Sequence, residues 1–357
     1  MRNLIKNKLL VFKRASILLV VLTAYSCGKK DEVVVAPEVA FGKWELTGNS
    51  GYFFRENRKN EKYVHINTDN TIDVLSEDPL GFKRVKSKIV TVSDDQITIS
   101  GSGEGGVVIY NYTLAEDTLI LENASGKTIE LIRNNNIPEV SDWFEELTIL
   151  SEGPAPWVED VDIAYNGTHI VYGNGRESET IGLVNTDNFN LDGEITTTHN
   201  AFVVEVEKGD ASDRSIFQGN DGRDTFYAYT ENTNTFVFKS PELGAWIKGL
   251  ASIDGENIWV SSGNEQQLYH YNYSNQEIVQ TIDLDFKPQG LDYQGGFLYV
   301  SDGAKIHKCQ TSPTLKPVKS YGIKNHRIYG IAYDGTNFWI SAWVNGSYKL
   351  IKTDLTL

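Results

Sequence analysis

A short sequence motif returns three times in the C-terminal half of this chain, at a spacing of about 40 residues. Its clearest part is an apolar run that contains an aromatic residue and ends in serine, and these aromatic residues are Trp259, Tyr299 and Trp339. A glycine that opens another apolar run precedes each of them. A repeat of this length, made of short apolar runs and turn residues, is one small antiparallel sheet. Such a sheet cannot bury its own faces, so the copies must stack.

The repeat therefore predicts an all-β fold with a five-bladed β-propeller over residues 136–357. Besides the three clear copies, residues 162–168 align with residues 330–336 almost residue for residue, which adds an inner strand of a further blade. A degenerate copy lies between them, with strand patterns at residues 201–206, 215–218, 225–229 and 235–239.

The ring of blades is expected to close through a strand from before the first blade. The last blade shows strand patterns at residues 328–333, 337–342 and 348–353, and a fourth does not follow. Residues 147–150 form an orphan strand pattern just ahead of the first blade. Because a closed ring leaves no unpaired sheet edge, we expect this segment to be the outer strand of the final blade.

Residues 40–135 predict a second β domain, a small up-and-down barrel. Eight short alternating segments between residues 43 and 133 are joined by Asn, Asp and Gly turns. Gly42-Lys43-Trp44 resembles the opening of lipocalin-like domains, in which the Trp plugs one end of the barrel. We expect side chains to fill so short a barrel, and the alternative is a ligand in its interior.

The N-terminus carries an export signal and a candidate lipid attachment site. Residues 1–26 combine basic residues with an apolar stretch, which is typical of a secretory signal peptide. Ala24-Tyr25-Ser26-Cys27 resembles the lipobox of bacterial lipoproteins, which implies acylation of Cys27 and a tether over residues 27–39. The resemblance implies export through the inner membrane and a lipid anchor in the outer membrane. The charged residues 28–32 resemble a signal for the cell surface.

Charge and cysteine content limit the partners and the chemistry. Removal of the five basic residues of the signal peptide changes the formal net charge from −15 to −20. Nucleic acid is therefore not expected as a partner. Cys27 and Cys309 are the two cysteines of the sequence, so acylation of Cys27 leaves no internal disulfide. Cys309 is expected to be a packed strand residue.

We expect a ligand surface on one face of the propeller. The connections between blades and the turns between second and third strands emerge together there, and we call this surface the loop face. Its candidate residues are Trp157, Glu159, Asp160, Arg176, Trp246, Lys248, Lys287, Gln289, Arg327, Tyr329 and Trp343. Aromatic planes flanked by polar groups suit a glycan, a peptide or a protein surface. Alternatively, Trp157 and Trp246 pack between blades and the charges are solvated.

The repeat resembles those of the NHL, regucalcin-like and glutaminyl-cyclotransferase-like group of short-repeat propellers, which includes both binding proteins and enzymes. Asn257-Ile258-Trp259 resembles a cyclotransferase blade, but residues 251–253 lack the acidic residue which that family places on the preceding inner strand. The sequence has no phosphate loop, no Gly-x-Ser-x-Gly motif and no zinc-ligand spacing, so no cofactor is expected. A divalent cation such as calcium at Glu159 or Asp160 stays open.

Two hypotheses for function follow. The first is a surface-anchored lipoprotein that acts as a binding or scaffold module, with its ligand on the loop face. The second is a propeller enzyme, a hydrolase, lyase or cyclase, that uses Glu159 or Asp160 in the channel with or without a cation.

Overall fold

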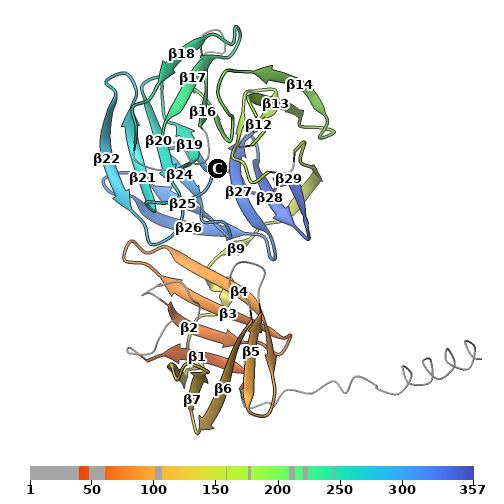
Figure 1. The fold of residues 1–357 in the computed structure, drawn as a ribbon, viewed down its shortest axis with the longest axis vertical. Coiled ribbons are helices and arrows are strands. Elements are labelled where there is room, and N and C mark those ends of the chain that lie inside the picture. The colour runs from red at the N-terminus through yellow and green to blue at the C-terminus, as the bar shows by residue number, and fades with distance from the viewer. Residues whose placement is uncertain are drawn as a thin grey trace, which may run out of the picture.

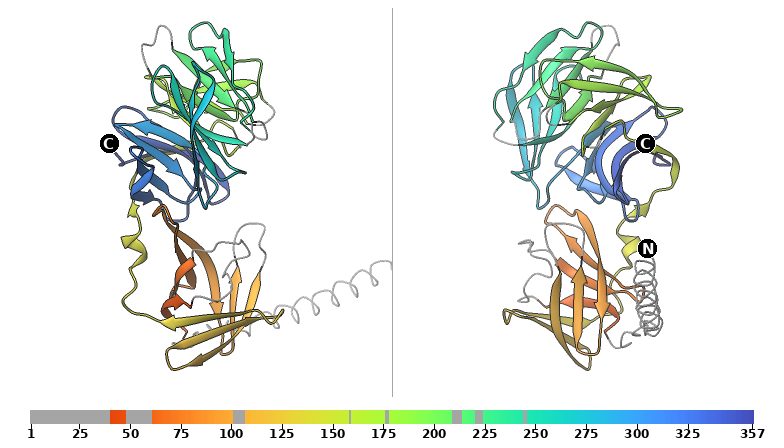
Figure 2. Two further views of the ribbon diagram at one scale, coloured as in Figure 1. Left: turned by 90° about the vertical axis from the view of Figure 1, so that its left-hand side faces the viewer. Right: turned by 45° about the vertical axis from the view of Figure 1, so that its right-hand side comes forward.

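The computed structural model describes residues 40–47, 61–100, 107–157, 159–175, 178–208, 214–219, 224–243 and 246–357. They form two β domains, a barrel and a propeller. The barrel lies below the propeller in Figure 1 and Figure 2. The signal peptide, Cys27, the tether and Arg176 lie outside the described residues. Within those ranges, no helix is long and apolar enough to cross a membrane.

The N-terminal domain is a closed barrel of eight antiparallel strands, as expected. Its strands are β1 (Gly42–Leu46), β2 (Glu61–Ile66), β3 (Thr71–Glu77), β4 (Lys83–Val92), β5 (Gln96–Ser100), β6 (Val108–Ala115), β7 (Thr118–Asn123) and β8 (Thr128–Arg133). Trp44 of β1 is fully buried and donates a hydrogen bond from Nε1 to the Ala40 carbonyl oxygen at 3.2 Å. The Arg133 guanidinium covers it, 4.4 Å from the ring centroid. Inward side chains such as Val64 and Leu121 pack in one cluster, in accord with a filled interior.

The C-terminal domain is a five-bladed β-propeller, and the described part of the chain is all-β apart from one short 3₁₀ helix, η1 (Val140–Asp142). Blade 1 consists of β11 (Ile163–Tyr165), β12 (His169–Gly173), β13 (Thr180–Asn185) and β14 (Leu191–Thr196). Blade 2 consists of β15 (Val203–Val206), β16 (Ser215–Gly219), β17 (Phe226–Thr230) and β18 (Phe236–Lys239). Blade 3 consists of β19 (Ile247–Ser252), β20 (Asn257–Ser262), β21 (Gln267–Asn272) and β22 (Glu277–Asp283). Blade 4 consists of β23 (Leu291–Gln294), β24 (Phe297–Ser301), β25 (Ile306–Gln310) and β26 (Lys316–Gly322). Blade 5 consists of β27 (Arg327–Tyr333), β28 (Phe338–Val344), β29 (Ser347–Thr353) and the earlier β10 (Ile149–Pro154).

The expected closure of the ring is confirmed. Strand β10 pairs antiparallel with β29, with Ile149 opposite Thr353. The closing strand begins later than expected, however. The Leu147 amide donates to the Gly322 carbonyl oxygen at 2.8 Å, and β9 (Glu145–Glu146) adds a parallel strand to the outer edge of blade 4. The segment before the first blade therefore joins blade 4 to blade 5 as well as closing the ring.

In the three clear copies, the repeated serine of the motif bonds its blade to the next. The hydroxyl of Ser261 donates to the Gln289 carbonyl oxygen at 2.8 Å, and that of Ser301 donates to the Ile328 carbonyl oxygen at 2.8 Å. Ser341 donates to the Val161 carbonyl oxygen at 2.6 Å across the closure between blades 5 and 1. The repeat therefore encodes polar contacts between blades in addition to apolar ones.

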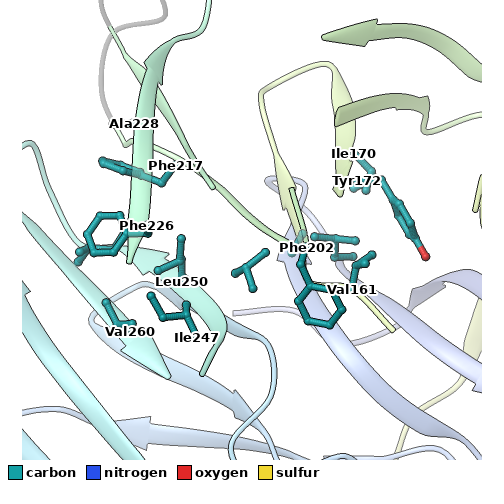
Figure 3. Close-up of a cluster of buried hydrophobic side chains, with 14 of the residues drawn as sticks. Val161, Ile170, Tyr172, Phe202, Phe217, Phe226, Ala228, Ile247, Leu250 and Val260 are labelled. Atoms are coloured by element: carbon teal, nitrogen blue, oxygen red, sulfur yellow. The ribbon is translucent and has the colours of Figure 1, made fainter. Parts of the chain in front are cut away.

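Apolar side chains fill the contacts between neighbouring blades near the channel. Figure 3 shows part of this core, where Phe217 and Phe226 of blade 2 approach Leu250 and Val260 of blade 3. The repeated glycine keeps the inner strands close to one another, because a Cβ atom at Gly290 would clash with the Tyr329 carbonyl oxygen.

The barrel docks on blade 4 through its β3–β4 hairpin. Phe82 is fully buried there, with its ring centroid 5.1 Å from those of Phe286 and His307. Arg84 Nε donates to Asp302 Oδ2 at 2.9 Å, and that carboxylate is almost wholly buried. Because Phe286 and Asp302 lie in connections of the loop face, the barrel covers the loop face at blade 4.

Candidate functional site

Six of the loop-face candidates lie in connections, whereas Lys248, Arg327, Tyr329 and Trp343 lie in strands, which extend further toward the loop face than the repeat pattern predicts. Those of the β10–β11 connection are Trp157, Glu159 and Asp160; those around the β18–β19 connection are Trp246 and Lys248; those of the β22–β23 connection are Lys287 and Gln289; those of blade 5 are Arg327, Tyr329 and Trp343. Nothing in the structure tests whether they bind a ligand, so the set stays a prediction.

Among the described residues, the loop-face candidates Tyr329 and Trp343 belong to one group of aromatic side chains on blade 5. Trp343 meets Tyr348 edge to face at 4.7 Å between centroids, and Tyr348 lies 6.1 Å from Tyr329. The Arg327 guanidinium lies 5.3 Å from the Tyr329 ring centroid. Burial raises the pKa of Tyr329 to about 12, with Arg327 opposing the shift and Asp160 adding to it. Tyr329 is therefore a neutral hydrogen-bonding group at neutral pH.

The sequence left open whether Trp157 and Trp246 bind a ligand or pack between blades, and the two side chains differ in burial. Trp157 is half-buried, packs over Gly182 and lies 6.0 Å from the Tyr172 ring centroid, so it belongs to the packing of blade 1. Trp246 is 46% exposed and so stays available on the surface. The other side chains are spread round the rim, with Lys287 exposed and the Lys248 ammonium 4.4 Å from the Phe202 ring centroid.

A pocket of about 340 Å³ lies at the opposite mouth of the channel, where the first and second strands of the blades turn. We call it the channel pocket. Its wall comes from blades 1, 2, 4 and 5 and consists of Ala164, Tyr165, Gly167, Glu205, Val206, Glu207, Lys208, Arg214, Asp292, Gln294, Ala332, Tyr333 and Gly335. None of these residues belongs to the loop-face set.

Three buried carboxyl groups extend from the middle of the channel to the pocket. Asp162, Glu205 and Asp292 come from blades 1, 2 and 4 and are 1%, 5% and 4% exposed. The backbone amide of Leu250 donates to Asp162 Oδ2 at 3.2 Å, and that of Ser252 donates to Glu205 Oε1 at 3.1 Å. Asp162 and Glu205 therefore also bind blade 3, which contributes no side chain to the pocket wall.

Burial and mutual repulsion keep these carboxyl groups from ionising together. Burial raises the pKa of Glu205 well above its ordinary value, and the charge of Asp292 adds to the shift while Lys208 opposes it. Burial and the charge of Glu205 raise the pKa of Asp162 in the same way. Burial also raises the pKa of Asp292, but Lys208 and hydrogen bonds from Gln294 and from the Tyr333 and Tyr293 backbone amides oppose that shift. Of the three carboxyl groups, Asp292 therefore ionises most readily.

Asp292 and Lys208 form an incomplete ion pair in the pocket wall. Lys208 Nζ lies 3.8 Å from Asp292 Oδ1, beyond hydrogen-bond distance, and 5.3 Å from the Tyr293 ring centroid. Gln294 Nε2 donates to the same Oδ1 at 3.1 Å. Lys208 Nζ and Asp292 Oδ2 are buried, and neither has a hydrogen-bond partner within the described residues. Both atoms can therefore accept a ligand.

The remaining ionic side chains of the pocket have hydrogen-bond partners. Arg214 binds the Glu231 carboxylate through Nε. Glu207 Oε2 accepts a hydrogen bond from the Ser215 amide at 2.8 Å, and its Oε1 accepts one from the Tyr273 hydroxyl at 2.6 Å. Arg214 is therefore neutralised by an ion pair, whereas Glu207 is held in place by neutral donors.

The sequence analysis missed this site, although departures from the repeat mark part of it. Asp292 stands where the other clear copies have Ala251 and Ala332, and Asp162 stands where the last copy has Gly330. An acidic residue at a packing position of a repeat is a signal for a buried carboxyl group. Glu205 lies in the degenerate blade, where no reliable alignment could reveal such a departure.

A metal site is not evident in the described part of the chain, where no group of three or more His, Cys, Asp or Glu side chains is arranged to hold an ion. Calcium at Glu159 or Asp160 therefore stays a prediction. The chemistry that the pocket offers by itself is hydrogen bonding, ion pairing and proton transfer by carboxyl groups.

No protein-family model matches this chain, and no curated protein matches its sequence. Among solved structures, the chain is similar to a glutaminyl cyclase of Myxococcus xanthus, with 10% identity, a TM-score of 0.48, and coverage of 58% of this chain and 95% of that one. It is also similar to a selenomethionine-substituted virginiamycin B lyase of Staphylococcus aureus, with 13% identity, a TM-score of 0.35, and coverage of 88% and 96%. Neither similarity bears on the activity of this chain.

Proposed function

We propose that this protein is a lipid-anchored binding protein that holds a small polar ligand in the channel pocket. The observation that supports the proposal most is the pair of buried ionic atoms without hydrogen-bond partners, Lys208 Nζ and Asp292 Oδ2, in a pocket of about 340 Å³. Burying a charged group without partners is costly, so such atoms in a concave site favour a ligand that completes them. The volume is at the lower end of the range for small-molecule sites.

The channel pocket is a better ligand site than the loop face for two reasons. The loop face has the barrel docked on it at blade 4, and Trp157 is held within blade 1. The group around Trp343 and Tyr329 remains as a second surface, suited to a glycan, a peptide or a protein. A scaffold role would use that surface.

A binding screen tests the proposed function. Purified mature protein is melted with pools of amino acids, saccharides, polyols and organic acids, because a ligand at 100 times its Kd stabilises the folded state by about 2.7 kcal/mol. We expect at least one pool to raise the melting temperature, and we expect Asp292→Asn and Lys208→Met to remove that rise. Lys316→Met, exposed on β26, is the matched control and should keep it. Equal shifts in all four proteins would place the ligand elsewhere.

The lipid anchor is tested separately. The signal peptide and the lipobox resemblance around Cys27 support export and acylation, with the anchor in the outer membrane and the protein on the cell surface. The intact mass of detergent-extracted protein should show acyl chains on residue 27. A Cys27→Ser variant should leave the membrane fraction. Retention of that variant in the membrane without acylation would contradict the anchor.

An acid–base enzyme, a hydrolase, lyase or cyclase, is the second candidate. Its support is the presence in one pocket of two carboxyl groups of unequal acidity, because burial raises the pKa of Glu205 more strongly than that of Asp292, and a carboxylic acid and a carboxylate can donate and accept protons in the same reaction. Replacing Glu205 with Gln keeps the hydrogen-bonding shape and removes the transferable proton. An enzyme should then bind its substrate but turn it over at least about 100-fold more slowly. Unchanged turnover would exclude Glu205 as the acid.

A further inference from the structure

We propose that the ligand of the channel pocket is a small zwitterion whose ammonium and carboxylate groups lie a few ångströms apart, as in an α-amino acid. The proposal rests on the proposed binding function and names the ligand class of the same pocket. It places the ligand ammonium at Asp292 Oδ2 and the ligand carboxylate at Lys208 Nζ.

The first argument is the opposite sign of the two atoms that lack partners. Lys208 Nζ is a donor with three hydrogens, and Asp292 Oδ2 is an acceptor. Both are buried, and they belong to one loose pair whose Nζ to Oδ1 distance is 3.8 Å. A ligand with only a positive or only a negative group would bind one of these atoms and leave the other without a hydrogen-bond partner. A ligand that carries both charges provides a partner for each atom.

The second argument is the charge of the rest of the wall. Arg214 is paired with Glu231, and both oxygens of Glu207 accept hydrogen bonds. Glu205 accepts a hydrogen bond from the Ser252 amide, and burial raises the pKa of its carboxyl group, which favours the neutral form. The charged atoms left without a hydrogen-bond partner are therefore one cationic and one anionic, Lys208 Nζ and Asp292 Oδ2. A wholly anionic ligand would bring its charge toward Asp292, and a wholly cationic one toward Lys208, so a neutral pair of opposite charges fits best.

The third argument is the apolar part of the wall. Tyr165, Ala332 and Tyr333 line the pocket beside Asp292. The Tyr333 hydroxyl donates to the Gly335 carbonyl oxygen at 2.9 Å. Because its polar group already has a hydrogen-bond partner, the ring can make apolar contact with the ligand. An amino acid has the matching form, with two charged groups at one end and a side chain at the other.

Binding of matched ligands tests the proposal without any variant. The twenty free α-amino acids are titrated into the mature protein by calorimetry. The tightest binder is then compared with the amine that lacks its carboxylate and with the acid that lacks its amino group. We expect each half-ligand to bind at least tenfold more weakly, which is about 1.4 kcal/mol. If either half-ligand binds as tightly as the amino acid, the zwitterion proposal is wrong.

Two variants should show a crossed pattern. Asp292→Asn should weaken the amino acid tenfold or more and leave the acid half-ligand unchanged, because that half-ligand uses Lys208. Lys208→Met should weaken the amino acid and leave the amine half-ligand unchanged. Retained binding of one half-ligand also shows that each variant is folded. Equal losses for both half-ligands in both variants would contradict the assignment of the two charges.

The outcome separates this inference from the proposed function. If no amino acid binds but a neutral saccharide or polyol does, and Asp292→Asn abolishes that binding, the pocket is a ligand site and the zwitterion is wrong. If no pool binds and the variants behave like the wild type, both proposals fail. Lys316→Met, exposed on β26, is the matched control that should bind as the wild type does.

Discussion

The carboxyl groups of the channel are the residues on which the account depends most. They are buried between inner strands, and of the three only Asp292 lies within ion-pair distance of a cation of the described residues. Burying a carboxyl group costs free energy unless it keeps its proton or finds a partner. Asp162 and Glu205 receive backbone hydrogen bonds from blades 3 and 5, so they also contribute to holding the ring together.

Stability should depend on pH through Glu205. Its pKa in the folded state lies well above the ordinary 4.5, so the folded state binds the proton more tightly than the unfolded state. Its favourable contribution is complete below about pH 4.5 and is lost as the pH rises toward the folded pKa. The free energy of unfolding should therefore fall as the pH rises from 5 to 9. Urea unfolding of Glu205→Gln should show a flatter dependence of the free energy of unfolding on pH, and an unchanged slope would contradict the assignment.

At the level of the element, the serine that ends the repeated strand of the three clear copies forms a hydrogen bond to the next blade. Ser301 and Ser341 are buried and donate to carbonyl oxygens of the next blade. Such a bond explains why a serine recurs in an otherwise apolar run. Removing it leaves a buried carbonyl group without that donor, which costs more than the bond itself contributes.

Replacing Ser341 with Ala should destabilise the propeller by about 1 to 3 kcal/mol. Ser341 is the more telling position because its bond crosses the closure between blades 5 and 1. The matched control is Ser347→Ala, whose hydroxyl bonds to the Val344 carbonyl oxygen on the exposed surface, and which should change stability by less than about 0.5 kcal/mol. Urea unfolding measures both, and equal effects would remove the blade-to-blade bond as the explanation.

The repeat pattern was sufficient to predict the strands of the propeller and its closure, because packing of identical sheets imposes the same residues at the same positions. The bounds of the closing strand were harder to place. Leu147 is apolar and fits a strand pattern, but it is buried against blade 4, and β10 extends instead to Pro154. Alternation alone cannot tell which of two neighbouring sheet edges a short segment joins.

The site was less predictable than the fold for a related reason. Loop-face candidates such as Trp343 stand out in a sequence because they vary between copies, and they supported the loop-face hypothesis. Asp292 lies on an inner strand whose other copies have alanine, so its significance depends on which side chains surround it. Only the folded ring brings it beside Lys208, which is 84 positions away in the sequence.

At the scale of the whole molecule, the barrel and the propeller are joined by a buried polar interface. The Arg84 guanidinium lowers the pKa of Asp302 more than any other partner does, and holds it well below its usual range against the effect of burial. In the same interface, burial raises the pKa of Asp78 to about 7, and Asp285 of the propeller adds to that shift. Two carboxyl groups with opposite shifts make docking of the barrel depend on pH.

Docking of the barrel should weaken as the pH rises from 5 to 9. Asp78 has a folded pKa of about 7 against an ordinary 3.8, so its contribution is lost as the pH rises through about 7. Asp302 stays ionised over this range, because its pKa lies below 3.8, and keeps its bond to Arg84. Hydrogen exchange at the β3–β4 hairpin, corrected for intrinsic rates, should show less protection at pH 9 than at pH 6. Asp78→Asn should reduce this change, and a change of the same size in that variant would exclude Asp78 as the cause.

The most direct test of the central claim is a crystal structure of the protein with the tightest ligand of the binding screen. The account predicts electron density in the channel pocket, with a cationic or donor group of the ligand about 3 Å from Asp292 Oδ2 and an acceptor at the same distance from Lys208 Nζ. Density on the loop face beside Trp343, with the channel pocket holding solvent, would contradict it.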